Sequence, residues 1–286
     1  MAFLTPEKKI LIVGMGLIGG SYADALSAAG FELGGIDRSR SAIDTALRRG
    51  IILHGETSVR PEYVAAFDLI VFALYPHDFE VWVREYGGCI RPGALVTDVT
   101  GVKGTMVGRI QDLLSPGVEF VAAHPMAGRE LSGVENSDRR IFRDANFIIT
   151  PTERNSGEGI AALRELAGLL GFAKVSVLSP AEHDEMIAFL SQLAHCMAVA
   201  LMDCRECTHF AAYTGDSFRD LTRIARINEN MWTELFLANR KALLSQMDLF
   251  AEKFMELRDA LDRSDAEKLK YMMRLSTRRR SSFDKD

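Results

Sequence analysis

A glycine-rich turn near the start of the chain has the residue types and spacing that hold the phosphates of a dinucleotide. An apolar run at residues 10–13 leads into Gly14, Gly16 and Gly19, and a helical stretch follows. The first glycine of such a turn permits a tight bend, and the second lets the backbone approach a pyrophosphate. The third lets the helix pack closely, with its N-terminal N–H groups facing the phosphates. We therefore predict a dinucleotide site at Gly14, Gly16, Leu17, Ile18 and Gly19.

An acidic residue follows the second apolar run, about 20 residues beyond the turn. Asp37 stands where a carboxylate accepts both ribose hydroxyls of NAD and repels the 2′-phosphate of NADP. Arg38 and Ser39 follow directly, and a guanidinium with a hydroxyl can accommodate that phosphate. We predict NAD as the cofactor, with NADP as the alternative, and we place Arg38 and Ala73, at the end of another strand, beside it.

A candidate proton acceptor belongs to the same edge of the predicted sheet. His124 ends an apolar run that begins at Phe120, and ligands of doubly wound sheets lie at the carboxyl ends of the strands. An imidazole with a near-neutral pKa can accept a hydroxyl proton while a hydride leaves. The alternative is a histidine that only caps or hydrogen-bonds the fold.

A sheet with covering helices must position these residues. The first half alternates short apolar or β-branched runs with helical stretches, which predicts βαβ units in a doubly wound α/β (Rossmann) domain with a parallel sheet. We predict strands at 9–13, 31–36, 69–73, 94–98, 120–123, 146–150 and 174–178, with a helix at 157–170. Ser179 and Pro180 interrupt this pattern, so the predicted domains are 1–178 and 179–286.

The second domain is predicted to be all-α, because the strand patterns disappear after Pro180. Residues 182–206 and about 230–263 carry apolar side chains at helical spacing. The later helix presents more apolar surface than a domain of this size needs internally, at Phe250, Phe254, Leu257 and Leu261. We therefore expect a homodimer formed through these helices. The polar tail 278–286, which begins with three arginines, is expected to be a solvated end.

The composition is that of an ordinary globular protein. Hydrophobic residues make up 48% and charged residues 26% of the 286 positions. The 34 basic side chains are spread among 39 acidic ones, for a net charge of -5, so we do not expect nucleic acid as a partner. We find no cleavable leader and no run of about 18 apolar residues, and we therefore expect a cytoplasmic protein without a membrane partner.

Four cysteines in a chain of this length do not make a disulfide scaffold. Cys204, Cys207 and His209 form a C-x-x-C-x-H string of the kind that can bind zinc. A second ligand pair at suitable spacing is missing from the sequence, and both cysteines fall near the end of a helical pattern. We therefore expect free thiols and no metal.

Five segments of the sequence resemble the prephenate/arogenate dehydrogenase family, in order and in spacing. They are the glycine turn at 14–21, Asp-Val-Thr-Gly-Val-Lys at 98–103, His-Pro-Met-Ala-Gly-Arg at 124–129, Ser-Gln-Leu-Ala-His at 191–195, and Thr-Arg-Ile-Ala at 222–225 with Trp232. The resemblance spans nearly the whole chain, and it implies a homodimer with a dinucleotide-binding domain and a helical dimerisation domain. It also implies NAD-dependent oxidative decarboxylation of prephenate to 4-hydroxyphenylpyruvate in tyrosine biosynthesis, or of arogenate to tyrosine.

The resemblance assigns roles to charged side chains. His124 falls on the catalytic histidine of the family. Arg223 falls on the arginine that binds the ring carboxylate, a role that suits a planar guanidinium, whereas an ion pair with Asp216 or Asp220 is the structural alternative. Lys103 corresponds to a lysine that supports developing negative charge, with an exposed surface lysine as the alternative.

Three further residues are expected around the substrate. Trp232 falls on a pocket wall in the family, although a core tryptophan would have the same pattern. His195 and Ser191 lie one helical turn apart and form a polar stripe that we expect to face the substrate, with a hydrogen-bonded core histidine as the alternative.

Three positions depart from the family pattern. Gly101 stands where many members have a serine that hydrogen-bonds the 4-hydroxyl of the substrate, and Thr100 is the candidate to supply that contact here. Ala194 replaces a proline. Arg129 replaces a threonine or serine, and it could bind the side-chain carboxylate. These departures concern the choice of substrate rather than the class of reaction.

Two other functions compete with this reading. A dehydrogenase of a β-hydroxy acid would use a lysine of the helical domain, for which Lys241 is the candidate, but the surrounding motif is missing. A dinucleotide-binding regulator would need no proton acceptor. The pairing of His124 with Arg223 argues against a regulator.

Overall fold

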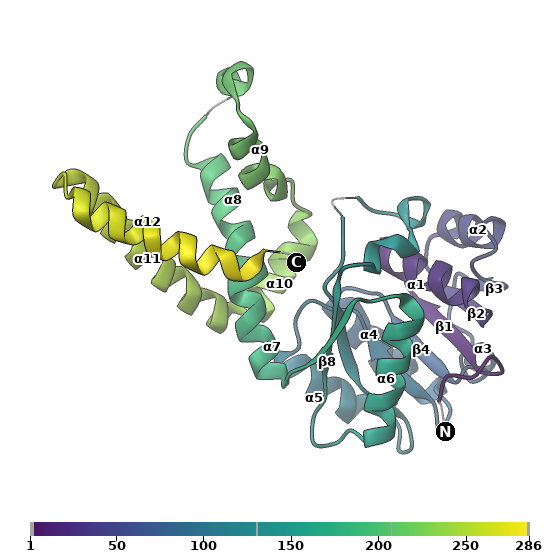
Figure 1. Ribbon diagram of the computed structural model, residues 1–286. Helices are drawn as coiled ribbons and strands as arrows, with labels where there is room; N and C mark the ends of the chain where they lie inside the picture. Colours follow the sequence, from purple (N-terminus) through teal and green to yellow (C-terminus); the bar gives the residue numbers. More distant parts are fainter. Residues whose placement is uncertain (1–2, 130, 207, 285–286) are drawn as a thin grey trace.

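The computed structural model describes residues 3–129, 131–206 and 208–284, which form a sheet domain followed by a helical domain (Figure 1). The helical domain begins with α7 (Pro180–Ile187). It touches the sheet domain where α7 packs against α5 (Gly104–Leu113) and where α10 (Glu229–Ala238) packs against α4 (Pro76–Tyr86). The seam between the domains therefore lies beside the helices that follow β4 and β5.

The main sheet has six parallel strands in the order β3-β2-β1-β4-β5-β6. Their bounds are β1 Lys9–Val13, β2 Glu32–Ile36, β3 His54–Glu56, β4 Leu69–Phe72, β5 Leu95–Asp98 and β6 Glu119–Phe120. This order is that of a doubly wound fold, whose ligands bind beyond the carboxyl ends of the strands where the order reverses, here between β1 and β4. The predicted Rossmann architecture is confirmed, and β3 is a strand that the sequence did not reveal.

Alternate residues of the central strands β1 and β4 enter separate cores on the two faces of the sheet. On β1, Ile10 and Ile12 join one buried cluster, whereas Leu11 and Val13 join the other. Burial on both faces is what makes such strands continuously apolar. The helices of this domain include α1 Leu17–Ala28, α2 Arg40–Arg48, α3 Pro61–Val64, α4, α5 and α6 Gly157–Leu170.

A second sheet of three strands, in the order β7-β8-β9, contains the candidate base. Its strands are β7 Ala122–Pro125, β8 Asn146–Thr150 and β9 Lys174–Val177. β7 runs antiparallel to β8, so the expectation of parallel strands throughout was wrong here. The predicted strand at 120–123 is divided, because β6 ends at Phe120 and β7 begins at Ala122. His124 therefore lies within β7 rather than after its end.

The predicted helix at 182–206 is observed as a nearly continuous run from Pro180 to Asp203 with a change of pitch. α7 leads into a π-helical segment, η4 (Ala188–Leu193), and then into α8 (Ala194–Asp203). Single π-helical turns inside α-helices are frequent at functional sites, and this one contains Ser191 and precedes His195.

The rest of the helical domain differs from the sequence prediction at two points. The single helix predicted at about 230–263 is two helices, α10 and α11 (Arg240–Asp262), which meet at Asn239. The three arginines expected in a solvated tail are exposed as expected, but they form the last turn of α12 (Ala266–Arg280), where cations interact favourably with the helix dipole. The short helix α9 (Asp216–Thr222) packs beside α8 (Figure 1).

Large apolar side chains remain exposed on the helical domain of the single chain. Phe250, Phe254 and Leu261 of α11 are among them, as the sequence predicted for this surface. The run Pro180–Asp203 is long and apolar enough to cross a membrane by length and composition alone, with 28% of its most apolar window buried. The expectation that no such stretch exists was wrong, because mean hydropathy tolerates the few polar residues in the run. Core and interface helices of soluble proteins pass the same test.

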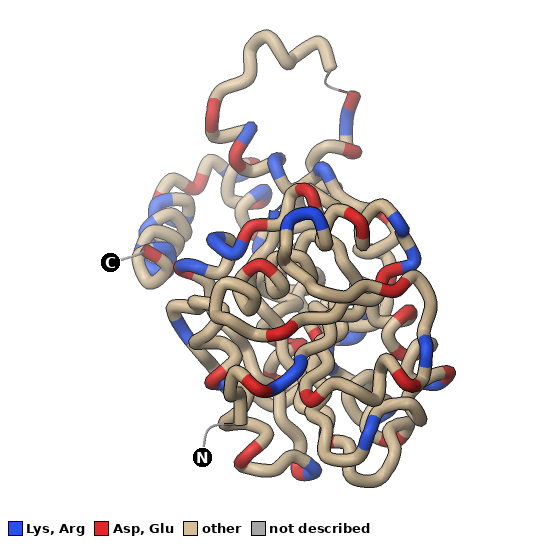
Figure 2. The backbone as a smooth tube through the Cα atoms, turned by 90° about the vertical axis from the view of Figure 1, so that its right-hand side faces the viewer, with Lys and Arg blue, Asp and Glu red and all other residues tan. Residues whose placement is uncertain are grey.

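Charges are mixed along the chain. In the view of Figure 2, Lys and Arg alternate with Asp and Glu over both domains, and no face of a single sign stands out. Many of these residues form exposed pairs, such as Arg154 with Asp112. This view gives no support to an electrostatic footprint for nucleic acid.

Candidate active site

The glycine turn has the geometry that a dinucleotide requires. Gly14 adopts φ +97°, and a Cβ there would lie 2.4 Å from the Ala73 carbonyl oxygen. A Cβ on Gly19 would lie 1.9 Å from the Gly14 carbonyl oxygen, whereas a Cβ on Gly16 would meet nothing within 4 Å. The first and third glycines therefore permit close packing, and the second opens the turn to a ligand. The first turn of α1, with Leu17 and Ile18, points its N–H groups toward that opening.

Asp37 organises the neighbouring loop. Its carboxylate accepts hydrogen bonds from the backbone N–H groups of Met15 and Ser39, both at 2.7 Å. The Ser39 hydroxyl in turn accepts from Ala42 N at the start of α2, at 3.3 Å. Ser39 is thus engaged as a helix cap, while Arg38 is exposed. The arrangement fits the adenosine ribose of NAD, because a fixed carboxylate disfavours a 2′-phosphate.

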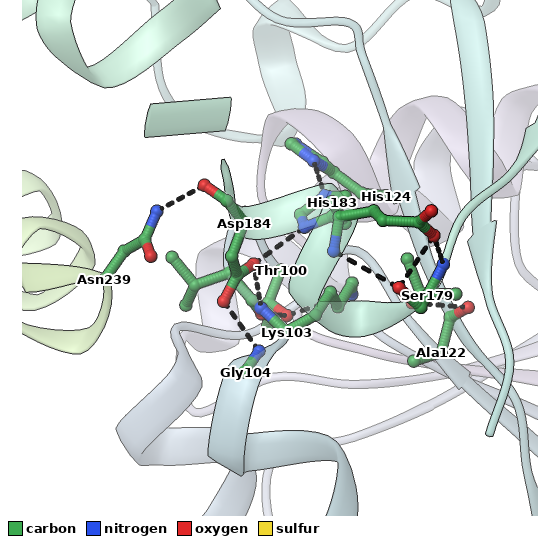
Figure 3. A network of polar contacts seen from close by, with 12 residues as sticks. Thr100, Lys103, Gly104, Ala122, His124, Ser179, His183, Asp184 and Asn239 are labelled. Atoms are coloured by element: carbon green, nitrogen blue, oxygen red, sulfur yellow. Dashed lines mark hydrogen bonds and ion pairs between the residues drawn. The ribbon is translucent and has the colours of Figure 1, made fainter. Parts of the chain in front are cut away.

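His124 is the first member of a chain of three side chains. Its Nδ1 lies 2.9 Å from His183 Nε2, and His183 Nδ1 lies 2.8 Å from Asp184 Oδ1 (Figure 3). His183 is completely buried, whereas His124 is half-buried. Burial lowers the pKa of His124 well below its ordinary value of 6.5, and the charges of His183 and Lys103 lower it further. His124 is therefore held as a neutral imidazole.

Sequence reasoning missed His183 and Asp184. They occupy the first helix after the domain boundary, 59 residues from His124 in the case of His183. Adjacent His and Asp residues at the start of α7 were the available signal, but nothing in the sequence places them beside β7. The contact exists because α7 packs against α5 at the seam.

Lys103 is fully buried near the hydrogen-bonded side chains of His124, His183 and Asp184. Its Nζ donates to Asp98 Oδ2 and to the Ala123 carbonyl, both at 2.6 Å, and to Thr100 Oγ1 at 3.2 Å. Asp98 also accepts from Ala123 N at 3.1 Å. The ion pair therefore holds both backbone groups of the residue before His124. Three partners already occupy the ammonium group, and the Thr100 hydroxyl is bonded to Asp98, to the Val102 carbonyl and to Lys103 itself. These positions give no support to the direct substrate contacts expected of Lys103 and Thr100.

Trp232, the expected pocket wall, lies against the ring of His195. The rings of His195 and Trp232 stack with centroids 3.8 Å apart and planes inclined by 31°. His195 Nδ1 lies 2.9 Å from the Ser191 carbonyl oxygen, so this nitrogen carries the hydrogen, because a carbonyl can only accept. Ser191 thus orients the ring through its backbone. These three residues come from η4, α8 and α10.

The two candidate carboxylate-binding arginines are both exposed. Arg223 begins a short 3-10 helix, η6 (Arg223–Ala225), which packs against α8, the helix of His195. Arg129 follows β7, and its guanidinium lies 4.0 Å from Asp138 Oδ2. Arg223 is thus on an element that borders the helix of His195, and Arg129 is on the segment after the candidate base.

Gly101 lies between the two domains, opposite the candidate base. A Cβ at this position would be 3.8 Å from His124 Nε2 and 3.6 Å from Leu235 Cδ2 of α10. Glu234, the preceding residue on α10, accepts a hydrogen bond from the backbone N–H of His77 in α4. His124 Nε2 therefore faces the seam between the domains, a common location for ligand sites.

A metal site finds no support in the described ranges 3–129, 131–206 and 208–284. These residues include no group of three or more His, Cys, Asp or Glu that could hold an ion. Cys204 is exposed near the end of α8, and its thiol bonds the Leu201 carbonyl at 3.2 Å. Cys207, the other cysteine of the C-x-x-C-x-H string, lies outside the described residues.

Two family models match the chain in succession. The prephenate dehydrogenase nucleotide-binding domain matches residues 22–177, and the prephenate dehydrogenase dimerization domain matches residues 179–275. The chain belongs to the prephenate dehydrogenase family. Members of this family are NAD-dependent oxidoreductases, so the chain is an enzyme of this class.

Known proteins agree with this membership over nearly the whole chain. It is similar to a prephenate dehydrogenase of Bacillus subtilis, at 30% identity over 91% of this chain and 72% of that protein. The structure resembles that of an A. aeolicus prephenate dehydrogenase in complex with hydroxyphenyl propionate and NAD+, with a TM-score of 0.89, 29% identity, and coverage of 99% of this chain and 100% of the other. It also resembles a Synechocystis arogenate dehydrogenase, with a TM-score of 0.82, 25% identity, and coverage of 96% and 100%.

Proposed function

We propose that this protein is an NAD-dependent prephenate dehydrogenase, which converts prephenate to 4-hydroxyphenylpyruvate and CO2. The observation that carries the proposal is the position of His124 Nε2, which faces the seam between the domains beside Gly101. A neutral imidazole at that point can accept the proton of a ring hydroxyl. Membership of the family supports the substrate class.

The residues of the glycine turn fit NAD. Gly14, Gly16 and the first turn of α1 would hold the pyrophosphate, and Asp37 would hold the adenosine ribose. When bound, NAD supplies the acceptor for the hydride that leaves C4 of the ring.

The protein's own residues then handle the proton and the carboxylates. His124 accepts the 4-hydroxyl proton at Nε2. Arg223 grips the ring carboxylate bidentately until the bond between ring and carboxylate breaks, and the bonding electrons enter the ring as CO2 leaves. The stacked rings of His195 and Trp232 form a wall against which a flat, aromatising ring can lie. Arg129 is assigned to the side-chain carboxylate, the part that prephenate shares with arogenate.

The test is direct. Purified protein is mixed with prephenate or arogenate and with NAD or NADP, and formation of the reduced cofactor is followed by absorbance. We expect turnover with prephenate and NAD. Faster turnover with arogenate would make arogenate the substrate of the same reaction. Absence of turnover in all four mixtures would rule out the proposed function.

We further propose that the protein works in the cytoplasm as a homodimer through its helical domain. The family match to a dimerization domain at 179–275 supports this assembly, as do the exposed apolar side chains of α11. We place the division between the domains at residues 178 and 179, where the two family matches meet. Light scattering of the purified protein tests the assembly, and a monomer at micromolar concentration would contradict it.

A further inference from the structure

We infer that His183 and Asp184 are positioning residues, which hold His124 in the tautomer that carries its hydrogen on Nδ1, so that Nε2 is the proton acceptor. This inference rests on the proposed role of His124 as the base. It extends that role to two buried side chains from the other domain, arranged in a line with His124 (Figure 3).

Asp184 fixes which atoms donate along the hydrogen-bonded row Asp184, His183 and His124, because a carboxylate can only accept hydrogen bonds. Its Oδ1 accepts from Lys103 N at 2.8 Å and its Oδ2 from Gly104 N at 2.7 Å, at the start of α5. Both carboxylate oxygens thus accept from backbone donors at a helix N-terminus, where a carboxylate is favourably placed. The third partner, His183 Nδ1, must therefore donate to it.

The orientation of His183 in turn fixes which nitrogen of His124 carries the hydrogen. Burial lowers the pKa of His183, although its hydrogen bond to Asp184 opposes the shift, so the ring is neutral with a single N–H group. With that hydrogen on Nδ1, His183 Nε2 has a lone pair and accepts from His124 Nδ1. A neutral His124 that donates from Nδ1 has its own lone pair on Nε2, the nitrogen that faces Gly101.

The same chain helps once the proton has arrived. Protonated His124 still donates from Nδ1 to His183, whose ring is polarised by the anionic Asp184. The positive charge of Lys103 disfavours a proton on His124, and the Asp98 carboxylate, which pairs with Lys103, offsets that charge. A side chain that merely filled space at position 183 would give neither a fixed tautomer nor this polarisation.

The first arm of the test measures the tautomer itself, in protein without substrate or cofactor. Nitrogen-15 spectra of histidine-labelled protein distinguish protonated from unprotonated ring nitrogens. We expect His124 to carry its hydrogen on Nδ1 in the wild type and to become a tautomer mixture in Asp184→Asn. His54→Gln, a change at an exposed residue of β3, assigns one signal and serves as the matched control. Hydrogen on His124 Nε2 in the wild type would overturn the inference, whatever the activity.

The second arm measures turnover. Replacing the orienting carboxylate of a Ser-His-Asp triad by an amide lowers kcat by about 10⁴-fold, through the wrong tautomer. Here we expect Asp184→Asn to lower kcat by at least about 10²-fold, with the KM values for prephenate and NAD near wild type.

Variants of His183 keep this arm independent of Asp184, which also binds the start of α5. The Gln amide oxygen in His183→Gln can still accept from His124 Nδ1, so this variant should retain more activity than His183→Leu. Thermal melting of both variants separates loss of fold from loss of orientation. Equal kcat in two folded variants would overturn the positioning role. Absence of turnover in the wild type would instead remove the proposed function and leave the tautomer result standing.

Discussion

Lys103 Nζ lies 2.6 Å from Asp98 Oδ2, and both side chains are fully buried in the sheet domain. Burial lowers the pKa of Lys103, while the charge and hydrogen bond of the Asp98 carboxylate oppose this shift. The pair also binds both backbone groups of Ala123, one residue before the base. A buried ion pair whose members have other hydrogen bonds fixes a geometry more than it adds stability.

Removal of one partner of this pair should therefore lower the stability of the fold strongly. Lys103→Met leaves the Asp98 carboxylate buried without its cation, and breaking such a pair costs about 3 to 5 kcal/mol. Urea unfolding measures this loss. Arg154→Met breaks the exposed pair with Asp112 and should change stability by less than about 1 kcal/mol. Similar losses in the two variants would show that the buried pair has no special role.

The pH dependence of kcat/KM should reflect the lowered pKa of His124. The imidazole must be neutral to accept a proton, and a pKa well below 6.5 keeps it neutral as the pH falls through that value. Activity is therefore retained there and lost only at lower pH, as the pH passes through the lowered pKa. His183→Gln keeps an acceptor for His124 Nδ1 but removes the second imidazole, which repels a proton on His124 once it is protonated itself at low pH, so the acid limb should move to higher pH. An unmoved limb would mean that His183 does not influence the base.

The parts of this site that sequence could predict are local. Gly14, Gly16, Gly19 and Asp37 follow from spacing within one strand, turn and helix, and the doubly wound fold follows from alternating elements. His124 stood out because it follows an apolar run at the ligand-binding edge of the sheet and because the catalytic histidine of the family falls there. In each case the residues that decide the structure are close together in the chain.

The remaining parts depend on contacts between distant segments. His183 reaches His124 only because α7 docks on α5, and the partners of Lys103 come from β5 and β7. Periodicity also cannot detect the π-helical segment at Ala188–Leu193, because its residues are as apolar as those of the flanking helix. The break at Asn239 is stabilised from outside the helix, by bonds from its amide to the Asp184 carbonyl and to Gln192, both at 2.8 Å.

Substitutions of Arg223 and of His124 should change different kinetic parameters. Arg223→Ala removes a group that binds the ring carboxylate, so the KM for prephenate should rise by at least about 10-fold, the effect of losing a charged hydrogen bond of 1.5 to 3 kcal/mol. His124→Asn removes the base, so kcat should fall by about 10² to 10⁴-fold with NAD binding unchanged. Arg219→Ala, an exposed arginine of α9 paired with Asp216, is the control for Arg223. A normal KM in Arg223→Ala would remove that residue from its role.

Cofactor preference should depend on the charge at position 37. Asp37→Asn keeps an oxygen for the Met15 N–H group but removes the negative charge that repels a 2′-phosphate. We expect the ratio of kcat/KM for NAD over NADP to fall by at least about 10-fold, because one unit charge near a phosphate contributes more than about 1.4 kcal/mol at an effective dielectric of 20. Asp44→Asn is the matched control, since this aspartate pairs with Arg40 on the exposed side of α2. An unchanged ratio in Asp37→Asn would assign the preference to another group, for which the exposed Arg38 would be tested next.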